Sequence, residues 1–267
     1  MQPSRQPIGI FDSGVGGLAV ARVIKDLLPY EELYYVGDTA NWPYGEQTTA
    51  NLRAYVRAVG SLLLQQNCKA ILIACNTATA AAADALQEYV GPHVPVLNVI
   101  DPVVAYARQR YAGKAVGLIG TKYTIASSIY TQRFQALRAE IQLKALATPL
   151  LVPMVEEGKL QQLVLEEYLA HPHFAEIQAL ILGCTHYCFI KQPIVDYYQN
   201  RLEIIDGASL LAASLKALLT KHQLLQPGEP IRGDQFVATK LTPGFQAATK
   251  RLFGQEVHLA SLPMLEV

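Results

Sequence analysis

Short apolar runs alternate with longer amphipathic or Ala- and Leu-rich segments along almost the whole chain. Three of the longer segments predict helices, at residues 18–28, 50–66 and 210–221. The short runs are nearly continuous in apolar residues, which is typical of parallel strands buried on both faces. They predict strands at residues 8–11, 33–36, 70–74, 94–99, 115–119, 143–147, 179–182 and 202–205, and a loop at 227–230 precedes a last strand–helix–strand segment at 236–262. This alternation predicts an α/β fold with largely parallel sheets.

The pattern of the first half of the chain recurs in the second half. The segment "IGIFDSG" (8–14) matches "VGLIGTK" (116–122), and "AILIACNT" (70–77) matches "ALILGCTH" (179–186). In each half one strand ends in a polar turn, and a second strand ends in a cysteine followed by polar residues. Cys75 follows Asp12 by 63 residues, and Cys184 follows Gly120 by 64. Two matched pairs at the same interval indicate an internal repeat.

The repeat indicates where a ligand binds. In open α/β sheets ligands lie beyond the carboxyl ends of the strands, and each half has a cysteine there. We therefore expect two pseudo-symmetric domains, residues 1–97 plus 208–267 and residues 98–207, with the active site in the cleft between them. Cys75 and Cys184 are expected to approach the ligand from opposite sides.

The overall composition argues against several classes of protein. With 51% hydrophobic and 16% charged residues among 267, the chain can bury a large core. Its formal net charge is zero, and no block of Lys or Arg offers a nucleic acid or an anionic membrane an electrostatic site. Polar residues interrupt the longest apolar stretch, 70–83, and the N-terminal segment lacks the apolar region of a signal peptide. We expect a soluble cytoplasmic protein without a nucleic-acid or membrane partner.

Four cysteines are too few and too scattered for a disulfide framework in a chain of this size. Cys68 and Cys188 fit best as small buried hydrophobic residues. A redox pair is not favoured, because the sequence has no C-x-x-C. Cys184, His186 and Cys188 could ligate zinc, but a second pair of ligands is missing. A hydrolase that uses Cys184 with His186 would leave Cys75 and the repeat unexplained.

A pair of opposed thiols suits the inversion of a stereocentre. A thiol has a reference pKa of about 8.5, so it can serve as an acid when protonated and as a base when ionised. A ligand held between two such groups can lose a proton on one face and gain one on the other. A racemase runs in both directions and therefore needs matched groups on both sides.

A glycine-rich loop after the first strand leaves a different class of protein open. The segment "FDSGVGGLA" (11–19) contains G-x-G-x-x-A, and Asp38 lies 24 residues beyond the first of these glycines, as in NAD(P)-binding folds. However, Asp12 and Ser13 precede that glycine, and a carboxylate there would repel a pyrophosphate. Asp12 would instead suit an ammonium group, and the helix start could hold a carboxylate. Alternatively, Asp12 or Ser13 only caps the helix.

Four motifs in order along the chain resemble those of a known family. They are "IFDSGVGGL" (10–18), "YVGDTANWPYG" (35–45), "ACNTATA" (74–80) and "GCTHY" (183–187). Together they are similar to the cofactor-independent glutamate racemases of the aspartate/glutamate racemase superfamily, and the resemblance extends from residue 8 to "KRLFGQEV" (250–257). Related aspartate racemases carry a His and a Glu where this chain has Thr79 and His186, which favours glutamate.

The resemblance implies roles for individual residues. Cys75 and Cys184 would be the two acid/base catalysts, assisted by Asp12 and His186 respectively. A further carboxylate corresponds to Glu156 in "VPMVEEG" (152–158), beside Glu157. The residues that would bind the substrate are Asp12, Ser13, Tyr44, Gly45, Asn76, Thr77, Thr121, Thr185 and His186. Tyr44 could equally be a packing aromatic, and His186 a structural histidine in a turn.

The resemblance also implies the activity: interconversion of L- and D-glutamate without a cofactor or metal, to supply D-glutamate for peptidoglycan, by an enzyme that is often a homodimer. Two departures from the family pattern lie beside the expected site, Thr148 where Cys is common and Cys188 where Pro is common. The alternatives are a racemase for aspartate or another amino acid, an NAD(P)-dependent oxidoreductase and a non-catalytic amino-acid-binding module.

Overall fold

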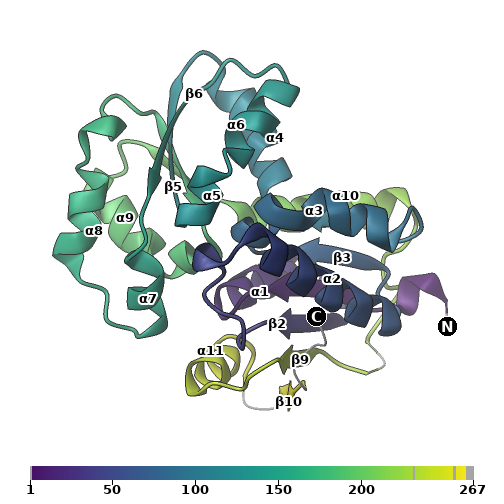
Figure 1. Ribbon diagram of the computed structural model, residues 1–267. Coiled ribbons are helices and arrows are strands. Elements are labelled where there is room, and N and C mark those ends of the chain that lie inside the picture. The colour runs from purple at the N-terminus through teal and green to yellow at the C-terminus, as the bar shows by residue number, and fades with distance from the viewer. Residues whose placement is uncertain (1, 231, 255–256, 263–267) are drawn as a thin grey trace.

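The computed structural model describes residues 2–230, 232–254 and 257–262, which form two parallel β-sheets surrounded by helices (Figure 1). The first sheet has the order β10-β9-β2-β1-β3-β4, and the second has the order β6-β5-β7-β8. The strands are β1 (Ile8–Asp12), β2 (Leu33–Gly37), β3 (Ala70–Ile73), β4 (Val96–Asn98), β5 (Ala115–Gly120), β6 (Gln142–Ala147), β7 (Ala179–Gly183), β8 (Glu203–Asp206), β9 (Gln235–Ala238) and β10 (His258–Ser261). Every pairing between these strands is parallel, so the predicted α/β class and parallel sheets are confirmed.

Helices follow most of the strands, and the three helices expected from the sequence are present as α1, α2 and α10. The α-helices are α1 (Gly16–Leu27), α2 (Thr49–Gln65), α3 (Asn76–Val90), α4 (Ile100–Tyr111), α5 (Lys122–Ala126), α6 (Ile129–Ala136), α7 (Leu151–Glu156), α8 (Gln162–Leu169), α9 (Lys191–Tyr198), α10 (Gly207–Lys221) and α11 (Pro243–Phe253). Short 3-10 helices are η1 (Pro3–Arg5), η2 (Tyr44–Glu46), η3 (Pro172–Phe174) and η4 (Thr185–Ile190). Within the described ranges, none of the helices has the length and apolar character needed to cross a membrane.

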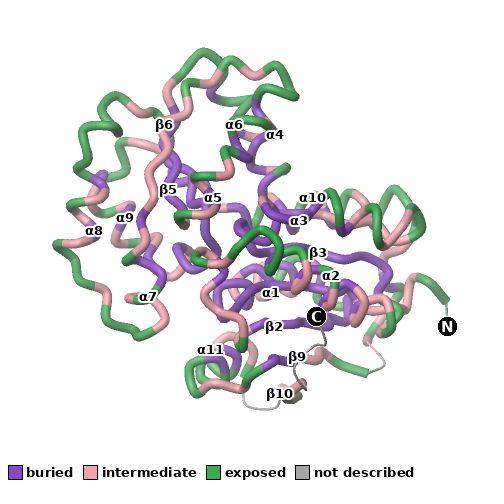
Figure 2. Tube along the Cα trace, in the orientation of Figure 1, coloured by how far each residue is buried: buried purple, intermediate pink, exposed green. Residues whose placement is uncertain are grey.

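Both faces of the first sheet are covered, which explains its nearly continuous apolar strands. Along β1, Ile10 points into a cluster with α1 and α10, whereas Phe11 points into a second cluster with α2 and α3. The second sheet is covered in the same way, by α4 and α6 on one face and by α7, α8 and α9 on the other. Figure 2 shows the central strands buried and the outer helices exposed along their far sides.

The predicted internal repeat has a structural counterpart. The order β2-β1-β3-β4 in the first sheet matches β6-β5-β7-β8 in the second. Phe11 of β1 pairs with Ile73, and Ile119 of β5 pairs with Leu182, each of these partners lying two residues before a cysteine. Cys75 and Cys184 therefore follow equivalent strands at equivalent heights in the two sheets.

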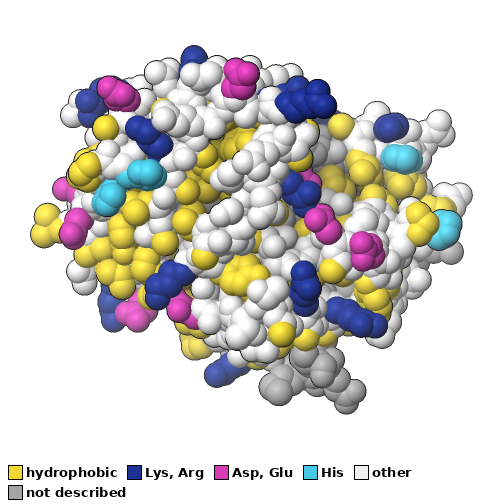
Figure 3. Space-filling model, turned by 45° about the horizontal axis from the view of Figure 1, so that its top comes forward, with side chains coloured by type: hydrophobic (Ala, Val, Ile, Leu, Met, Phe, Trp, Pro, Cys, Tyr) yellow, Lys and Arg dark blue, Asp and Glu magenta, His cyan; other side chains and the backbone are white. Residues whose placement is uncertain are grey.

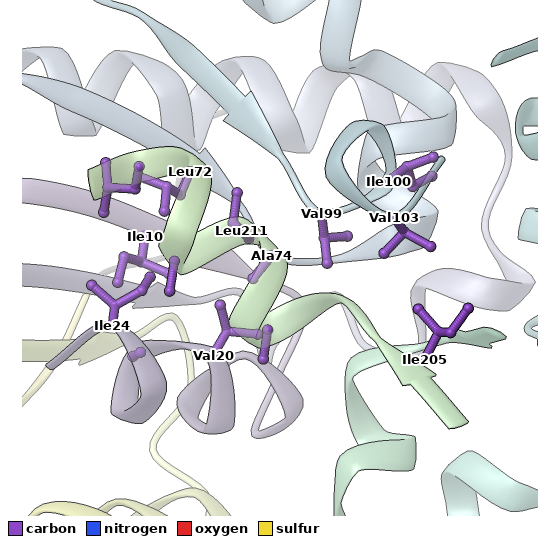
Figure 4. Packing of buried hydrophobic residues seen from close by; sticks show 14 of the residues in the cluster. Ile10, Val20, Ile24, Leu72, Ala74, Val99, Ile100, Val103, Ile205 and Leu211 are labelled. Atoms are coloured by element: carbon purple, nitrogen blue, oxygen red, sulfur yellow. The ribbon is translucent and has the colours of Figure 1, made fainter. Parts of the chain in front are cut away.

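The helix that follows the fourth strand of each repeat crosses over and packs against the other sheet. Helix α4 follows β4 of the first sheet but contacts β7 and α6, whereas α10 follows β8 of the second sheet but contacts α1 and β4. Figure 4 shows Leu211 of α10 beside Ala74, with Val99 and Val103 to one side, and all of them belong to one cluster with Ile205 of β8. A Cβ on Gly207 would lie 2.3 Å from Cγ2 of Val99, so glycine permits this close approach. One hydrophobic cluster thus joins the two halves and fixes how they face each other.

The strands of the first sheet come from residues 8–98 and 235–261, and those of the second from residues 115–206. The division into domains at 97/98 and 207/208 stays a prediction about folding units. The predicted first domain includes some residues that lie outside the described part of the chain, namely 1, 231, 255–256 and 263–267. On the face shown in Figure 3, Lys and Arg side chains lie apart from one another, with acidic side chains among them.

Candidate active site

A cavity of about 80 Å³ lies at the carboxyl ends of the strands, where residues from both halves of the chain meet. Ten of the residues singled out from the sequence line it: Ser13, Tyr44, Gly45, Cys75, Asn76, Thr77, Thr121, Cys184, Thr185 and His186. Thr148, expected beside the site, also lines the cavity, as do seven residues that were not predicted: Trp42, Pro43, Glu46, Lys122, Pro149, Val152 and Pro153. Trp42 and Pro43 lie within the motif at 35–45 and Glu46 directly follows it, so proximity in sequence was the available signal. Both cysteines face one cavity.

Cys75 ends the loop after β3 and caps helix α3. Its Sγ accepts a hydrogen bond from the backbone N–H of Ala78 at 3.4 Å, and its thiol donates to Oγ of Ser13 at 3.7 Å. Burial, and next the negative charge of Asp12, raise the pKa of the Cys75 thiol to about 12. Cys75 is therefore a neutral thiol in the ligand-free protein at neutral pH.

Asp12 lies behind Cys75, at the end of β1, and is fully buried. One carboxylate oxygen accepts from the backbone N–H of Gly14 at 2.9 Å, and the other accepts from the hydroxyl of Thr185 at 3.1 Å. Helix α1 begins after Val15 without a side-chain cap, so neither Asp12 nor Ser13 occupies its N-cap position. Burial raises the pKa of Asp12, while the charge of His186 and these hydrogen bonds act in the opposite direction. Asp12 thus joins the two halves beneath the cavity.

On the other side, His186 connects a carboxylate to Cys184. Nε2 of His186 lies 2.6 Å from Oε1 of Glu156, and Nδ1 lies 3.7 Å from Sγ of Cys184. Burial alone lowers the pKa of His186, but the contacts with Cys184 and Glu156 outweigh it and raise the pKa to about 10. The ring is therefore an imidazolium at neutral pH and donates a hydrogen bond to each neighbour. Of the two adjacent glutamates, Glu156 makes this contact, whereas exposed Glu157 pairs with Lys159.

Hydroxyl groups close the cavity where α3 meets α5. The Oγ1 atom of Thr77 lies 2.9 Å from that of Thr121, which caps α5, and 3.3 Å from that of Thr124. A Cβ on Gly45 would lie 2.9 Å from Cβ of Thr121, so the η2 segment also meets the second half closely.

Tyr44 and Glu46 form part of the entrance. The Tyr44 hydroxyl donates to Asp38 at 2.6 Å, and its ring packs near Phe11, with ring centroids 6.1 Å apart. Tyr44 is thus both a packing aromatic and a residue of the cavity wall. Exposed Glu46 lies 3.3 Å from Lys122 of the opposite half, across the mouth of the cavity.

The glycine loop has no space for a dinucleotide phosphate. A Cβ on Gly16 would lie 2.3 Å from Oγ1 of Thr185, because η4 packs directly on the start of α1. Asp38, which would hold a ribose in the NAD(P) hypothesis, is fully buried and accepts hydrogen bonds from Tyr44, Asn41 and Thr239. The glycine loop and Asp38 therefore both make contacts within the protein at the positions where the NAD(P) hypothesis would place a ligand.

The remaining cysteines are free thiols outside the cavity wall. Cys68 is buried beside β1, as expected, and Cys188 is half-buried; burial raises the pKa of each to about 12. In the part of the chain that the structure describes, no group of three or more His, Cys, Asp or Glu side chains has the arrangement of a metal site. Cys184, His186 and Cys188 accordingly do not form one.

Comparison with known proteins agrees with this geometry. A family described as Asp/Glu/hydantoin racemase matches residues 18–215. The glutamate racemase of Syntrophus aciditrophicus is 39% identical over 269 residues, covering 99% of this chain and 97% of the relative. The crystal structure of Francisella tularensis glutamate racemase with D-glutamate has a TM-score of 0.90 at 33% identity, covering 98% of this chain and 99% of that one. The Thermus thermophilus glutamate racemase has a TM-score of 0.87 at 37% identity, with 99% of both chains covered. The chain therefore belongs to the Asp/Glu/hydantoin racemase family of isomerases.

Proposed function

We propose that this protein is a glutamate racemase that interconverts L- and D-glutamate through two cysteines. The observation that carries the proposal is the position of Cys75 and Cys184, which follow equivalent strands of the two halves and line one cavity. Further support comes from relatives such as that of Syntrophus aciditrophicus, which is a glutamate racemase, and from the Francisella protein, which holds D-glutamate.

Each of the two sulfur atoms carries out one of the two proton transfers of the reaction. One cysteine, as a thiolate, takes the α-proton, and the electron pair of the broken C–H bond remains on the substrate. The other cysteine, as a thiol, gives its proton to the opposite face of the same carbon, so that the new C–H bond forms as its S–H bond breaks. In the reverse direction the two cysteines exchange roles. Because the thiols supply both proton transfers, the reaction needs no cofactor.

Each cysteine has its own supporting group. On one side the negative charge of Asp12 acts on Cys75, which keeps the thiol protonated and ready to donate. On the other side the imidazolium of His186, held by Glu156, donates to Sγ of Cys184.

The polar groups of the cavity suit an amino acid with two carboxylates. Helix α3 begins at Asn76, and the N–H groups of its first turn attract a carboxylate. Asp12 does not line the cavity, but its carboxylate lies just beneath it, and a negative charge there suits the substrate ammonium group. Hydroxyl, amide and ring N–H groups for the remaining contacts come from Ser13, Tyr44, Asn76, Thr77, Thr121, Thr185 and His186, with the backbone of Gly45.

The product of the forward reaction, D-glutamate, serves peptidoglycan synthesis and so the building of the cell wall. The enzyme works in the cytoplasm as a homodimer, with glutamate as its partner rather than a nucleic acid or a membrane. These assignments rest on the family resemblance, and gel filtration with light scattering would test the dimer.

Incubation with L-glutamate in D₂O tests the reaction directly. Loss of optical rotation with deuterium entering at Cα is expected, because the proton that returns to carbon comes from a thiol that exchanges with solvent. Parallel assays with aspartate test the alternative substrate, and a higher kcat/KM for aspartate than for glutamate would overturn the assignment.

Single substitutions test the two-base mechanism. Cys75→Ala and Cys184→Ala should each lower racemisation by at least about 100-fold, because each removes one of two required proton carriers. Cys188→Ala is the matched control, since Cys188 is a neighbouring free thiol that does not line the cavity. Full activity in either of the first two variants, with the fold intact by circular dichroism, would exclude the mechanism.

A further inference from the structure

Asn76 stands beside the reacting centre, and the orientation of its amide decides what it offers a substrate. It is the first residue of α3, directly follows Cys75 and lines the cavity, where only 3% of its surface is exposed. An amide presents either two N–H donors or a carbonyl acceptor, depending on how it is turned. A carboxylate is bound only by the donors.

A tyrosine from the opposite half occupies the carbonyl side of this amide. Tyr130 lies on α6, which packs beside α4 in the second half of the molecule (Figure 1). Its hydroxyl donates to Oδ1 of Asn76 at 2.8 Å, and both side chains are buried. Among the residues that the structure describes, Nδ2 of Asn76 has no hydrogen-bond partner, and it is not sealed away from the cavity. The two N–H donors are therefore free for a ligand.

The opposite orientation of the amide is disfavoured. Burial raises the pKa of Tyr130 well above its usual value, so the hydroxyl keeps its proton at any pH at which the enzyme works. If the amide were turned over, the phenolic hydrogen would face an NH₂ group and lose its acceptor. Leaving a buried donor without a partner costs more than a hydrogen bond contributes on average.

The same arrangement recurs in the second half of the repeat. The residue after Cys184 is Thr185, the counterpart of Asn76, and its hydroxyl donates across the cleft to Asp12. In both halves, therefore, the residue that follows the cysteine forms a hydrogen bond with a side chain of the other half. Because the hydrogen bond between Tyr130 and Asn76 joins the two halves, the orientation of the amide depends on how the halves pack together.

We infer that Tyr130 is a positioning residue, which acts through Asn76 by holding its amide with both N–H donors toward a carboxylate of the substrate. The inference rests on the proposed racemase function, because it assigns the carboxylate to glutamate. Tyr130 itself does not line the cavity.

A double-mutant cycle tests this role in the full-length enzyme. Tyr130→Phe removes only the hydroxyl and should lower kcat/KM for glutamate about tenfold when Asn76 is present. In an Asn76→Ala background the same change should alter kcat/KM less than about twofold, because the group through which Tyr130 acts is gone. An equal loss in both backgrounds, or no loss in the first, would overturn the inference. If the unchanged protein does not racemise glutamate, the proposed function fails instead.

A second measurement does not depend on the substrate. The side-chain amide signals of Asn76 in a ¹⁵N NMR spectrum can be assigned by their loss in Asn76→Ala. They should shift or broaden in Tyr130→Phe, and unchanged signals would show that the hydroxyl does not hold the amide. Tyr198→Phe is the matched control: its buried hydroxyl donates to the carbonyl of Leu169 at 3.1 Å, away from the cavity, so activity and the Asn76 signals should stay unchanged.

Discussion

The charge on His186 makes the stability of the folded protein depend on pH. Its pKa rises from 6.5 to about 10 on folding, because the contacts with Cys184 and Glu156 outweigh the effect of burial. An unfolded chain has neither contact, so its imidazole loses the proton near the ordinary value. Between about pH 6.5 and pH 10, His186 therefore carries a proton in the folded protein that it has lost in the unfolded chain.

The free energy of unfolding must fall as the pH rises through this window. The proton on His186 binds more tightly to the folded state, and this advantage shrinks as protons become scarcer. The contribution of His186 is complete below pH 6.5 and is lost as the pH approaches about 10. One unit of pKa corresponds to about 1.4 kcal/mol, so the free energy of unfolding should drop by about 2 kcal/mol between about pH 6.5 and pH 8.5. At higher pH the raised pKa values of Cys68, Cys75 and Cys188 add to the same trend.

Replacing Glu156 by Gln isolates its share of the effect. The substitution removes the charge that lies 2.6 Å from His186 but leaves the contact with Cys184, so the drop should shrink to about 1 kcal/mol. Urea unfolding at several pH values measures it, provided that the slope m stays constant. Glu157→Gln is the matched control, because Glu157 is exposed and pairs with Lys159. Stability that is flat or rising in the unchanged protein, or an equal drop in Glu156→Gln, would refute the assignment of the charge.

Two further substitutions test the packing that holds the site. Gly16→Ala should destabilise the fold by about 1–3 kcal/mol and lower activity at least tenfold, because the new Cβ would lie 2.3 Å from Oγ1 of Thr185. Thermal melting with activity assays would check this against Gly244→Ala, where the nearest atom is 4.0 Å away and no loss is expected. Lys69→Met should cost about 3–5 kcal/mol in urea unfolding, since it leaves the buried carboxylate of Glu31, now 2.5 Å from the Lys69 ammonium, without a neutralising cation. A loss below about 1 kcal/mol would show that this ion pair is not needed.

The fold could be predicted well from the sequence, because parallel strands that are covered on both faces appear as short, nearly continuous apolar runs. Apolar runs such as residues 179–182 have no polar alternation, and they recur at the spacing of a strand–helix unit. The repeated cysteine after such a run also located the cavity correctly, since the carboxyl ends of parallel strands meet at one edge of a sheet.

Contacts between the two halves could not be predicted from the sequence. Tyr130 belongs to no quoted motif, and its contact with Asn76 depends on how α6 and α3 face each other. The same holds for the choice between Glu156 and Glu157: the two are adjacent in sequence, and only the direction of the last turn of α7 brings the first of them to His186. Local pattern fixes which residues lie at a strand end, whereas side-chain partners across a cleft depend on the packing of whole elements.

The repeat supplies equivalent positions for the two thiols, but their surroundings are unequal. Cys75 lies near the carboxylate of Asp12, and Cys184 lies beside the imidazolium of His186. The two enantiomers of glutamate have the same free energy in water, so kcat/KM must be equal in the two directions whatever surrounds the thiols. Unequal surroundings can therefore appear only as parallel differences: the enantiomer with the higher kcat must also have the higher KM, by the same factor. A symmetric scaffold with asymmetric partners thus allows one enantiomer to be bound more tightly and the other to be turned over faster, without favouring either at equilibrium.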